Sequence, residues 1–192
     1  MSGASNRQPT GAPHSDGAAR GLLERIPLSV RMLVYGVAFL ALILVLLPWC
    51  ADRVGRFLLP ARQVEIGAWR IAGWILLAGA LAVYLRSSFL LSSRGRGAYV
   101  EFDPPTEFVA SGPFRWCRNP IAGCVVLMLL AIALAFSSIG VAALFLLSLI
   151  LAHLQVVLLE EPLLTKRFGE PYRAYLRTVP RWIPRPPRDG PQ

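Results

Sequence analysis

The chain has 192 residues, of which 55% are hydrophobic and 16% are charged, and its net charge is +9. Soluble domains are about 25% charged, so this composition favours a membrane protein. Four spans of about 20 residues each would use much of the chain. Little length then remains for a separate soluble domain of about 100 residues or more, which argues against a doubly wound nucleotide-binding domain.

Four apolar runs predict an all-α, polytopic membrane bundle with about four transmembrane helices. Residues 1–20, rich in Gly, Ser, Pro and Ala, are expected to be a disordered tail. The first run is long enough to cross the roughly 30 Å of a bilayer core. A polar loop over residues 52–65 is expected after it. The predicted spans are residues 28–51, 66–91, 120–136 and 139–159.

The last two spans are expected to form a hairpin around the Ser137-Ser138 turn, and a helical, interfacial cap follows over residues 160–185. Pro162 suits the first turn of a new short helix, and Gly169 is a plausible C-cap. Pro171 can open another helical turn, which Pro180 ends. One domain is thus predicted over residues 21–185, with a flexible tail at 186–192.

The placement of basic residues indicates orientation. They flank the apolar runs instead of forming a dense basic face, which argues for a membrane and against nucleic acid. The basic tails, the basic central loop and the even number of spans place both termini in the cytoplasm, in a bacterial inner membrane. Arg53, Arg56 and Arg62, in the predicted loop 52–65, argue against this orientation because they would face outward.

The cysteines and histidines predict neither a disulfide scaffold nor a metal site. Cys50, Cys117 and Cys124 lack the close CxxC spacing of a structural zinc site and suit packing within a membrane. His153 is the one histidine in the membrane half, and a single histidine does not supply enough ligands for a zinc or haem site.

The segment SGPFRWCRNP, residues 111–120, leads directly into the third predicted span. Gly112-Pro113 predicts a turn, Asn119 is a favourable N-cap, and Pro120 suits the first helical position. A capped helix start explains Asn119 and Pro120, but it does not explain the two arginines and two aromatic residues beside them. The N-terminus of a helix also binds anionic groups such as a carboxylate.

Glu160 and Glu161 stand at the C-terminal end of the fourth predicted span. Acids there oppose the helix dipole, and the edge of the hydrocarbon adds a desolvation cost, so a partner is expected. Arg115 or Arg118 is one candidate partner in a structural ion pair, and a ligand is the other. His153 lies two helical turns before Glu160, so a regular helix would place both residues on the same face. His153 is therefore a candidate for a buried residue of the site. The alternative is that His153 makes a hydrogen bond to a neighbouring helix.

At these clusters the sequence resembles a known family. SGPFRWCRNPIAG followed, after a helical hairpin, by EEPLLTKRFGEPYRAYLRTVPRWIP is similar to the isoprenylcysteine carboxyl methyltransferases and to the wider group that includes phospholipid methyltransferases. The resemblance covers about residues 100–185. It implies an integral membrane enzyme that uses S-adenosylmethionine, held between the last spans and the C-terminal segment, and methylates a lipid or small amphiphile from the bilayer.

The resemblance also implies which residues contact the cofactor and which assist the reaction. His153 and Glu160 are the candidates for removing a proton from an ammonium acceptor. The implied cofactor contacts are Thr106, Val109, Phe114, Arg118, Asn119, Pro120, Ile121, Ala122, Glu160 and Glu161.

Three positions depart from the family pattern. Asn119 replaces the commoner His and keeps a hydrogen-bonding side chain, and Ala122 stands where many members have Tyr. Val156 occupies the position of an Arg that binds the substrate carboxylate in prenylcysteine enzymes, which argues against that substrate. His153 and Gln155 remain possible substrate-facing groups. Two other functions stay open: a membrane reductase of the steroid 5α-reductase type that uses NADPH, and a non-catalytic scaffold.

Overall fold

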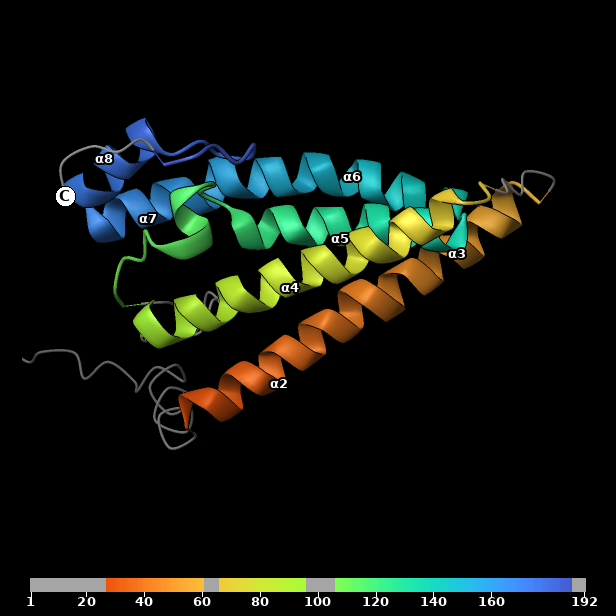
Figure 1. The fold of residues 1–192 in the computed structure, drawn as a ribbon, viewed down its shortest axis with the longest axis horizontal. Coiled ribbons are helices and arrows are strands. Elements are labelled where there is room, and N and C mark those ends of the chain that lie inside the picture. Colours follow the sequence, from red (N-terminus) through yellow and green to blue (C-terminus); the bar gives the residue numbers. More distant parts are fainter. Residues whose placement is uncertain (1–26, 61–65, 96–105, 188–192) are drawn as a thin grey trace, which may run out of the picture.

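The computed structural model describes residues 27–60, 66–95 and 106–187, and these ranges contain helices and no strand (Figure 1). The predicted all-α membrane fold is therefore confirmed. Three helices are long and apolar enough to cross a bilayer, namely Leu33–Leu58, Trp69–Gly95 and Ile139–Phe168. Pro120–Phe136 is apolar but shorter, so the predicted count of four spans is not confirmed. The predicted tail at 1–20, and residues 188–192 of the predicted tail at 186–192, lie outside the described residues.

The first spanning helix consists of α2 (Leu28–Ala41), a π-helical turn η1 (Leu42–Leu46) and α3 (Leu47–Leu58) without a break. Pro48 follows the π-helical turn. A proline inside an α-helix removes one backbone hydrogen bond and clashes with the carbonyl four residues earlier. The wider π turn directly before Pro48 accommodates this loss, so the helix continues through the proline.

The predicted C-terminal boundary of this span, Ala51, was wrong, because the helix continues to Leu58. Asp52 accepts hydrogen bonds from Arg56 Nε at 2.7 Å, one helical turn later, and from Ser138 Oγ at 2.7 Å. Two charges of the predicted loop, Asp52 and Arg56, are thus paired with each other within the helix, and Asp52 also bonds to the hairpin turn. Pairs four residues apart support a helix.

Helix α4 (Trp69–Gly95) packs along α5 (Pro120–Phe136), which lies at the centre of the bundle. Ala80 and Tyr84 of α4 form a buried cluster with Cys124 and Met128 of α5. Gly73 allows the closest approach, since a Cβ there would lie 2.5 Å from the Ala135 amide nitrogen. Gly73 thus lets α4 and α5 pack closely, as small residues do between membrane helices.

The hairpin leads from α5 into α6 (Ile139–Gln155), a second π turn η3 (Val156–Glu160), and α7 (Glu161–Phe168). The predicted break at Glu160 is absent: Pro162 follows a π turn as Pro48 does, and the helix continues to Phe168. Gly169 ends α7 with φ +62°, as predicted, and α8 (Glu170–Thr178) begins beside Pro171.

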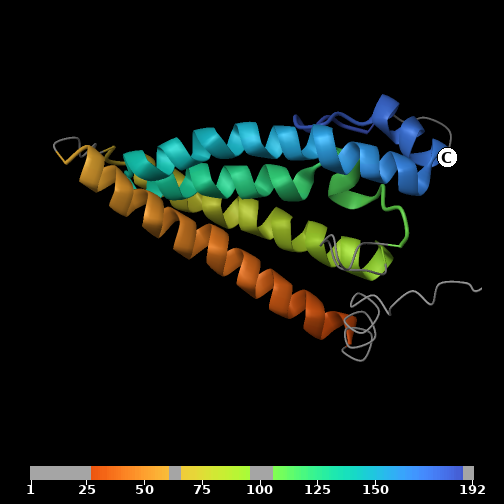
Figure 2. The same ribbon diagram turned by 180° about the vertical axis from the view of Figure 1, so that it is seen from behind.

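The two ends of the bundle carry different elements (Figures 1 and 2). The end of α3, the start of α4 and the α5–α6 hairpin lie at one end, which we call the hairpin end. The C-terminal part of α4, the short 3₁₀ helix η2 (Gly112–Arg115), the start of α5, α7 and α8 lie at the other, which we call the α8 end. All candidate site residues are therefore gathered at the α8 end or near it.

Candidate functional site

The turn before α5 has a fixed local conformation. Gly112 has φ +58°, in the left-handed region that favours glycine, and a Cβ there would lie 2.8 Å from a methyl group of Leu90. Pro113 is the second residue of η2, which buries the Phe114 side chain. This turn places residues 116–119 beside residues 180–185.

Residues 180–185, which we call the C-terminal strap, lie against residues 116–119. Two backbone bonds anchor the strap, one at each end. A third, side-chain bond lies between them, since Asn119 Nδ2 donates to the carbonyl oxygen of Arg181 at 3.2 Å. The backbone bonds are Arg118 N to Pro180 O at 2.9 Å and Arg185 N to Trp116 O at 3.0 Å.

Asn119 occupies the N-cap position of α5, as predicted, but its side chain does not cap the helix. Its amide donates to the strap instead. Pro120 has no N–H, so the first free donors of α5 are the amides of Ile121 and Ala122, which have no partner within the helix. This helix start keeps its capacity to bind an anion.

Glu161 is the centre of an ion-paired cluster. Its carboxylate accepts from Arg181 Nε at 2.8 Å and Nη2 at 2.9 Å, and Arg118 Nη1 lies 3.0 Å from Oε1. The side chains of Arg118 and Glu161 are only 11% and 13% exposed. The predicted ion pair between Arg118 and the Glu-Glu pair is therefore confirmed, with Glu161 as the partner. The buried Nε of Arg118 has no hydrogen-bond partner among the residues that the structure describes.

Glu160 has different surroundings from Glu161. Its Oε1 accepts from Gln155 Nε2 at 3.1 Å, one π turn earlier, and no other described residue forms a hydrogen bond with its side chain. Val156 is fully buried at the start of the same turn. Glu160 thus retains a carboxylate oxygen for a ligand, whereas both oxygens of Glu161 are already occupied.

His153 is exposed, so its predicted burial was wrong. The η3 turn lies between His153 and Glu160, and its i→i+5 hydrogen bonds change the register that a regular α-helix would give. His153 Nδ1 accepts from Trp182 Nε1 of the strap at 3.2 Å. The histidine therefore contacts the strap.

Aromatic side chains fill the space between residue 108 and the last two helices. Phe108 contacts the rings of Phe168, Tyr172 and Tyr175 at centroid distances of 5.2 to 5.7 Å. Tyr175 donates its hydroxyl to the carbonyl oxygen of Phe114 at 2.7 Å. Burial raises the pKa of Tyr172 to about 12, and it also raises the pKa of Tyr175. Both hydroxyls therefore remain protonated at neutral pH.

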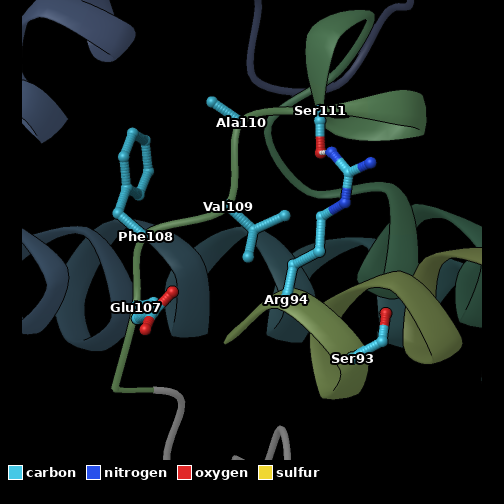
Figure 3. Close-up of a pocket in the computed structure, with 7 residues that line it drawn as sticks. All are labelled: Ser93, Arg94, Glu107, Phe108, Val109, Ala110 and Ser111. Carbon is cyan, nitrogen blue, oxygen red and sulfur yellow. Dashed lines mark hydrogen bonds between the residues drawn. The ribbon is translucent and has the colours of Figure 1, made fainter. Parts of the chain in front are cut away.

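Thr106 and Val109 lie on the side of this segment that faces α4. Thr106 donates from its backbone nitrogen to Gly95 O at 2.8 Å, which ties the segment to the end of α4. Val109 is buried and lines an open pocket of about 540 Å³ (Figure 3). The pocket is lined by Ser93, Arg94, Glu107, Phe108, Val109, Ala110 and Ser111.

The structure thus brings Arg118, Asn119 and Glu161 into one cluster and leaves Thr106 and Val109 at the pocket beside α4. Pro120 is buried, and Ile121 packs partly against the buried cluster around Tyr84. Sequence reasoning assigned no role to Arg181 or to the Trp182–His153 contact. Their signal was the Val-Pro-Arg-Trp stretch, residues 179–182, within the motif that carried the resemblance. In the described ranges no group of three or more His, Cys, Asp or Glu is placed to hold a metal ion.

Comparison with known proteins finds one family and two relatives. The family described as phospholipid methyltransferase matches residues 69–171, just over half of the chain. The nickel-cobalt-cadmium resistance protein NccN of Alcaligenes xylosoxydans xylosoxydans is 31% identical over 87 residues, which are 45% of this chain and 40% of the relative. The cobalt-zinc-cadmium resistance protein CzcN of Cupriavidus metallidurans is 28% identical over 139 residues, covering 63% of this chain and 64% of the relative. No solved structure matches.

Proposed function

Because this chain belongs to the phospholipid methyltransferase family, we propose that it is an integral membrane enzyme that transfers a methyl group from S-adenosylmethionine to a lipid or small amphiphile. The apolar helices support a membrane methyltransferase. The observation that carries the proposal is the cluster of Arg118, Asn119, Glu161 and Arg181 at the start of α5. It is a polar, charged site at one end of an otherwise apolar bundle.

The residues at this cluster fit the polar groups of S-adenosylmethionine. The buried Nε of Arg118 is a donor without a partner, and the first amides of α5 are uncapped. Together they suit the methionine carboxylate, because a helix start and a guanidinium both favour negative charge. The second oxygen of Glu160 suits an amino or hydroxyl donor, and buried aromatic rings such as Phe114 suit the adenine or the sulfonium.

In this proposal the two glutamates have different roles. Glu161 positions the site, because it holds Arg118 and ties the strap to α7 through Arg181. Glu160 contacts the cofactor, because Gln155 is its one hydrogen-bond partner among the described residues and it stands one residue away from the ion-paired cluster. Thr106 and Val109, on the α4 side of the loop, belong to the same proposed site by resemblance.

The bound cofactor supplies a methyl group already activated by its sulfonium. The protein then needs mainly to orient the two reactants and to exclude water. An acceptor that is an ammonium must first lose a proton, and Glu160 is the stronger candidate base. His153 is the weaker one, because its Nδ1 is already occupied by Trp182.

We place the helices in a bacterial inner membrane with both termini in the cytoplasm, so that the α8 end faces the cytosolic cofactor. The acceptor enters from the bilayer, with its apolar part among the exposed leucines of α6. The concentration of basic residues on α7, α8 and the strap supports this orientation, because cytoplasmic segments carry an excess of Lys and Arg.

Calorimetry on detergent-purified protein tests the proposal, with S-adenosylmethionine and NADPH titrated separately. We expect S-adenosylmethionine to bind and Glu160→Ala to weaken its binding at least tenfold. Glu170→Ala is the matched control, because Glu170 is an exposed carboxylate at the same end of the bundle and should leave binding unchanged. Binding of NADPH alone would favour the reductase, and binding of neither would favour a non-catalytic scaffold. Normal S-adenosylmethionine binding in Glu160→Ala would overturn the role of Glu160.

A further inference from the structure

One face of α4 carries an exposed stripe that leads into the pocket at the α8 end. Its members recur every three or four residues, which places them on one side of the helix. Leu85 is 51% exposed and Phe89 is 73% exposed. The opposite face, with Tyr84 and Ser87, is buried. The stripe consists of Ala82, Leu85, Arg86, Phe89 and Ser93.

Arg86 is a charged residue on this apolar stripe. It lies in a helix of 27 residues that is long and apolar enough to cross a bilayer, and it is exposed. It makes no hydrogen bond or ion pair within the part of the chain that the structure describes. A charge at the hydrocarbon edge is costly unless its long side chain reaches the polar head groups. Its partner is therefore expected outside the protein.

Arg94 supplies a second cation where the stripe meets the pocket. Its Nη1 donates to Ser111 Oγ at 3.0 Å, which holds the guanidinium across the pocket from Val109 and Ala110 (Figure 3). Its other N–H groups make no hydrogen bond to described residues. The pocket volume of about 540 Å³ is within the range of small-ligand sites. Glu107 is the acidic residue among those that line it.

We propose that this pocket and stripe bind an anionic membrane phospholipid. Its phosphate accepts from Arg94, which Ser111 orients, and its acyl chains lie along Leu85 and Phe89. Arg86 lies about two helical turns before Arg94 in α4, and its long side chain extends toward the same head-group layer. Among the described residues at this surface, the two arginines outweigh the single carboxylate of Glu107, so these residues are complementary to net negative charge. Basic pockets at the ends of membrane helices favour anionic head groups for this reason.

This lipid site goes beyond the proposed methyl transfer, although it shares Val109 with the cofactor contacts that the resemblance implies. Phe108 and Val109 both line the pocket beside α4, and the Phe108 ring also packs against α7 and α8. The segment 107–111 thus lies between α4 and the aromatic cluster, and Phe108 belongs to both the pocket and the cluster. The bound phospholipid is a resident ligand that fastens this segment to α4, and lipid binding requires no S-adenosylmethionine.

Native mass spectrometry of the detergent-released full chain tests the site, with phosphatidylglycerol, phosphatidylethanolamine and phosphatidylcholine added at equal concentrations. We expect phosphatidylglycerol to bind best and Arg94→Gln to weaken it about fivefold, the equivalent of about 1 kcal/mol for one basic residue near head groups. Arg94→Lys should retain most of the binding. Arg173→Gln is the matched control, because Arg173 is an exposed arginine on α8, away from the pocket.

Three outcomes would overturn the proposal. The first is equal loss of phosphatidylglycerol in Arg94→Gln and Arg173→Gln, which would indicate general charge attraction. The second is binding of either zwitterionic lipid as tight as that of phosphatidylglycerol. The third is displacement of phosphatidylglycerol by millimolar inorganic phosphate, which would assign the pocket to a soluble anion. Melting temperatures of the variants, measured by thiol-reactive dye fluorescence, verify that each remains folded.

Discussion

Glu161 and Arg181 form a bidentate ion pair, with Nε–Oε1 and Nη2–Oε2 distances of 2.8 and 2.9 Å, that joins α7 to the C-terminal strap. Arg118 reaches the same carboxylate from the loop before α5. Three segments far apart in the chain therefore meet at one side chain. Because the carboxylate is nearly buried, its removal leaves two arginines without compensation.

Glu161→Gln should destabilise the α8 end of the bundle. Breaking a buried pair by removing one partner typically costs about 3–5 kcal/mol, and the partial exposure of Arg181 reduces the expected loss to about 2 kcal/mol. Thermal unfolding in detergent measures this loss. Limited proteolysis with trypsin should at the same time cut the strap faster after Arg181, whereas the Arg185–Pro186 bond resists trypsin. Glu170→Gln, an exposed carboxylate, should change neither quantity, and equal effects of both variants would contradict the role of Glu161.

Gly73→Ala should weaken the packing of α4 on α5, whereas Gly79→Ala in the same helix should not. A Cβ at Gly73 would lie 2.5 Å from the amide nitrogen of Ala135 and 2.8 Å from the carbonyl oxygen of Ala131, and backbone atoms cannot move aside. The expected loss is about 1–3 kcal/mol, as for other overpacked sites. A Cβ at Gly79 meets nothing within 4 Å. Melting temperatures of the two variants provide the test. Equal melting temperatures would show that α4 can move away from α5 without loss of stability.

The sequence predicted the helical fold better than the helix ends. Apolar runs identify the spans because the length of an apolar segment is a local property of the sequence. The extension of the first helix from Ala51 to Leu58 is not local in this sense. Its Asp52 accepts a hydrogen bond from Ser138, which is 86 residues away in the chain. The continuity of the helix at Pro162 likewise depends on the π turn η3, which no local pattern indicated. Pro162 therefore predicted a helix boundary where the structure has a continuous helix, whereas the predicted span 28–51 already included Pro48.

The candidate site was predictable as a set of residues but not as a set of partners. The turn motif and the Glu-Glu pair identified Arg118, Asn119 and Glu161. Their main connection, the strap, comes from contacts between residues more than 60 positions apart. The sequence assigned the ion pair to the Glu-Glu pair as a whole, and the π turn η3 decides that Glu161 makes it.

The Cys117 thiol should react slowly with alkylating reagents in the folded protein. Burial raises its pKa, and the hydrogen bond from the Asn119 backbone and the nearby charge of Arg118 only partly offset this. Less thiolate is then present at a given pH than for an ordinary thiol, whose pKa is about 8.5. The pH at which alkylation reaches half its maximum rate should lie above that of the same protein unfolded in SDS.

The same pKa shift sets the direction of a stability change. Because the folded-state pKa is the higher one, the contribution of Cys117 to stability is fully present below the ordinary thiol pKa and is lost as the pH rises through the folded-state value. A variant with Cys50→Ser and Cys124→Ser isolates the alkylation of Cys117. Equal rates in folded and SDS-unfolded protein would show that the strap does not cover this thiol.

Tyr175→Phe should loosen the contact between α8 and η2, whereas Tyr172→Phe should not. Tyr175 donates its hydroxyl to the carbonyl oxygen of Phe114 at 2.7 Å in a buried position, so its loss should cost about 1 kcal/mol. Tyr172 is equally buried and contacts the same Phe108 ring, but its hydroxyl makes no hydrogen bond to described residues. Hydrogen exchange of the α8 amides measures the difference. Faster exchange in Tyr175→Phe alone is the expected result, and matching exchange in the two variants would mean that ring packing, not the hydroxyl, holds α8 in place.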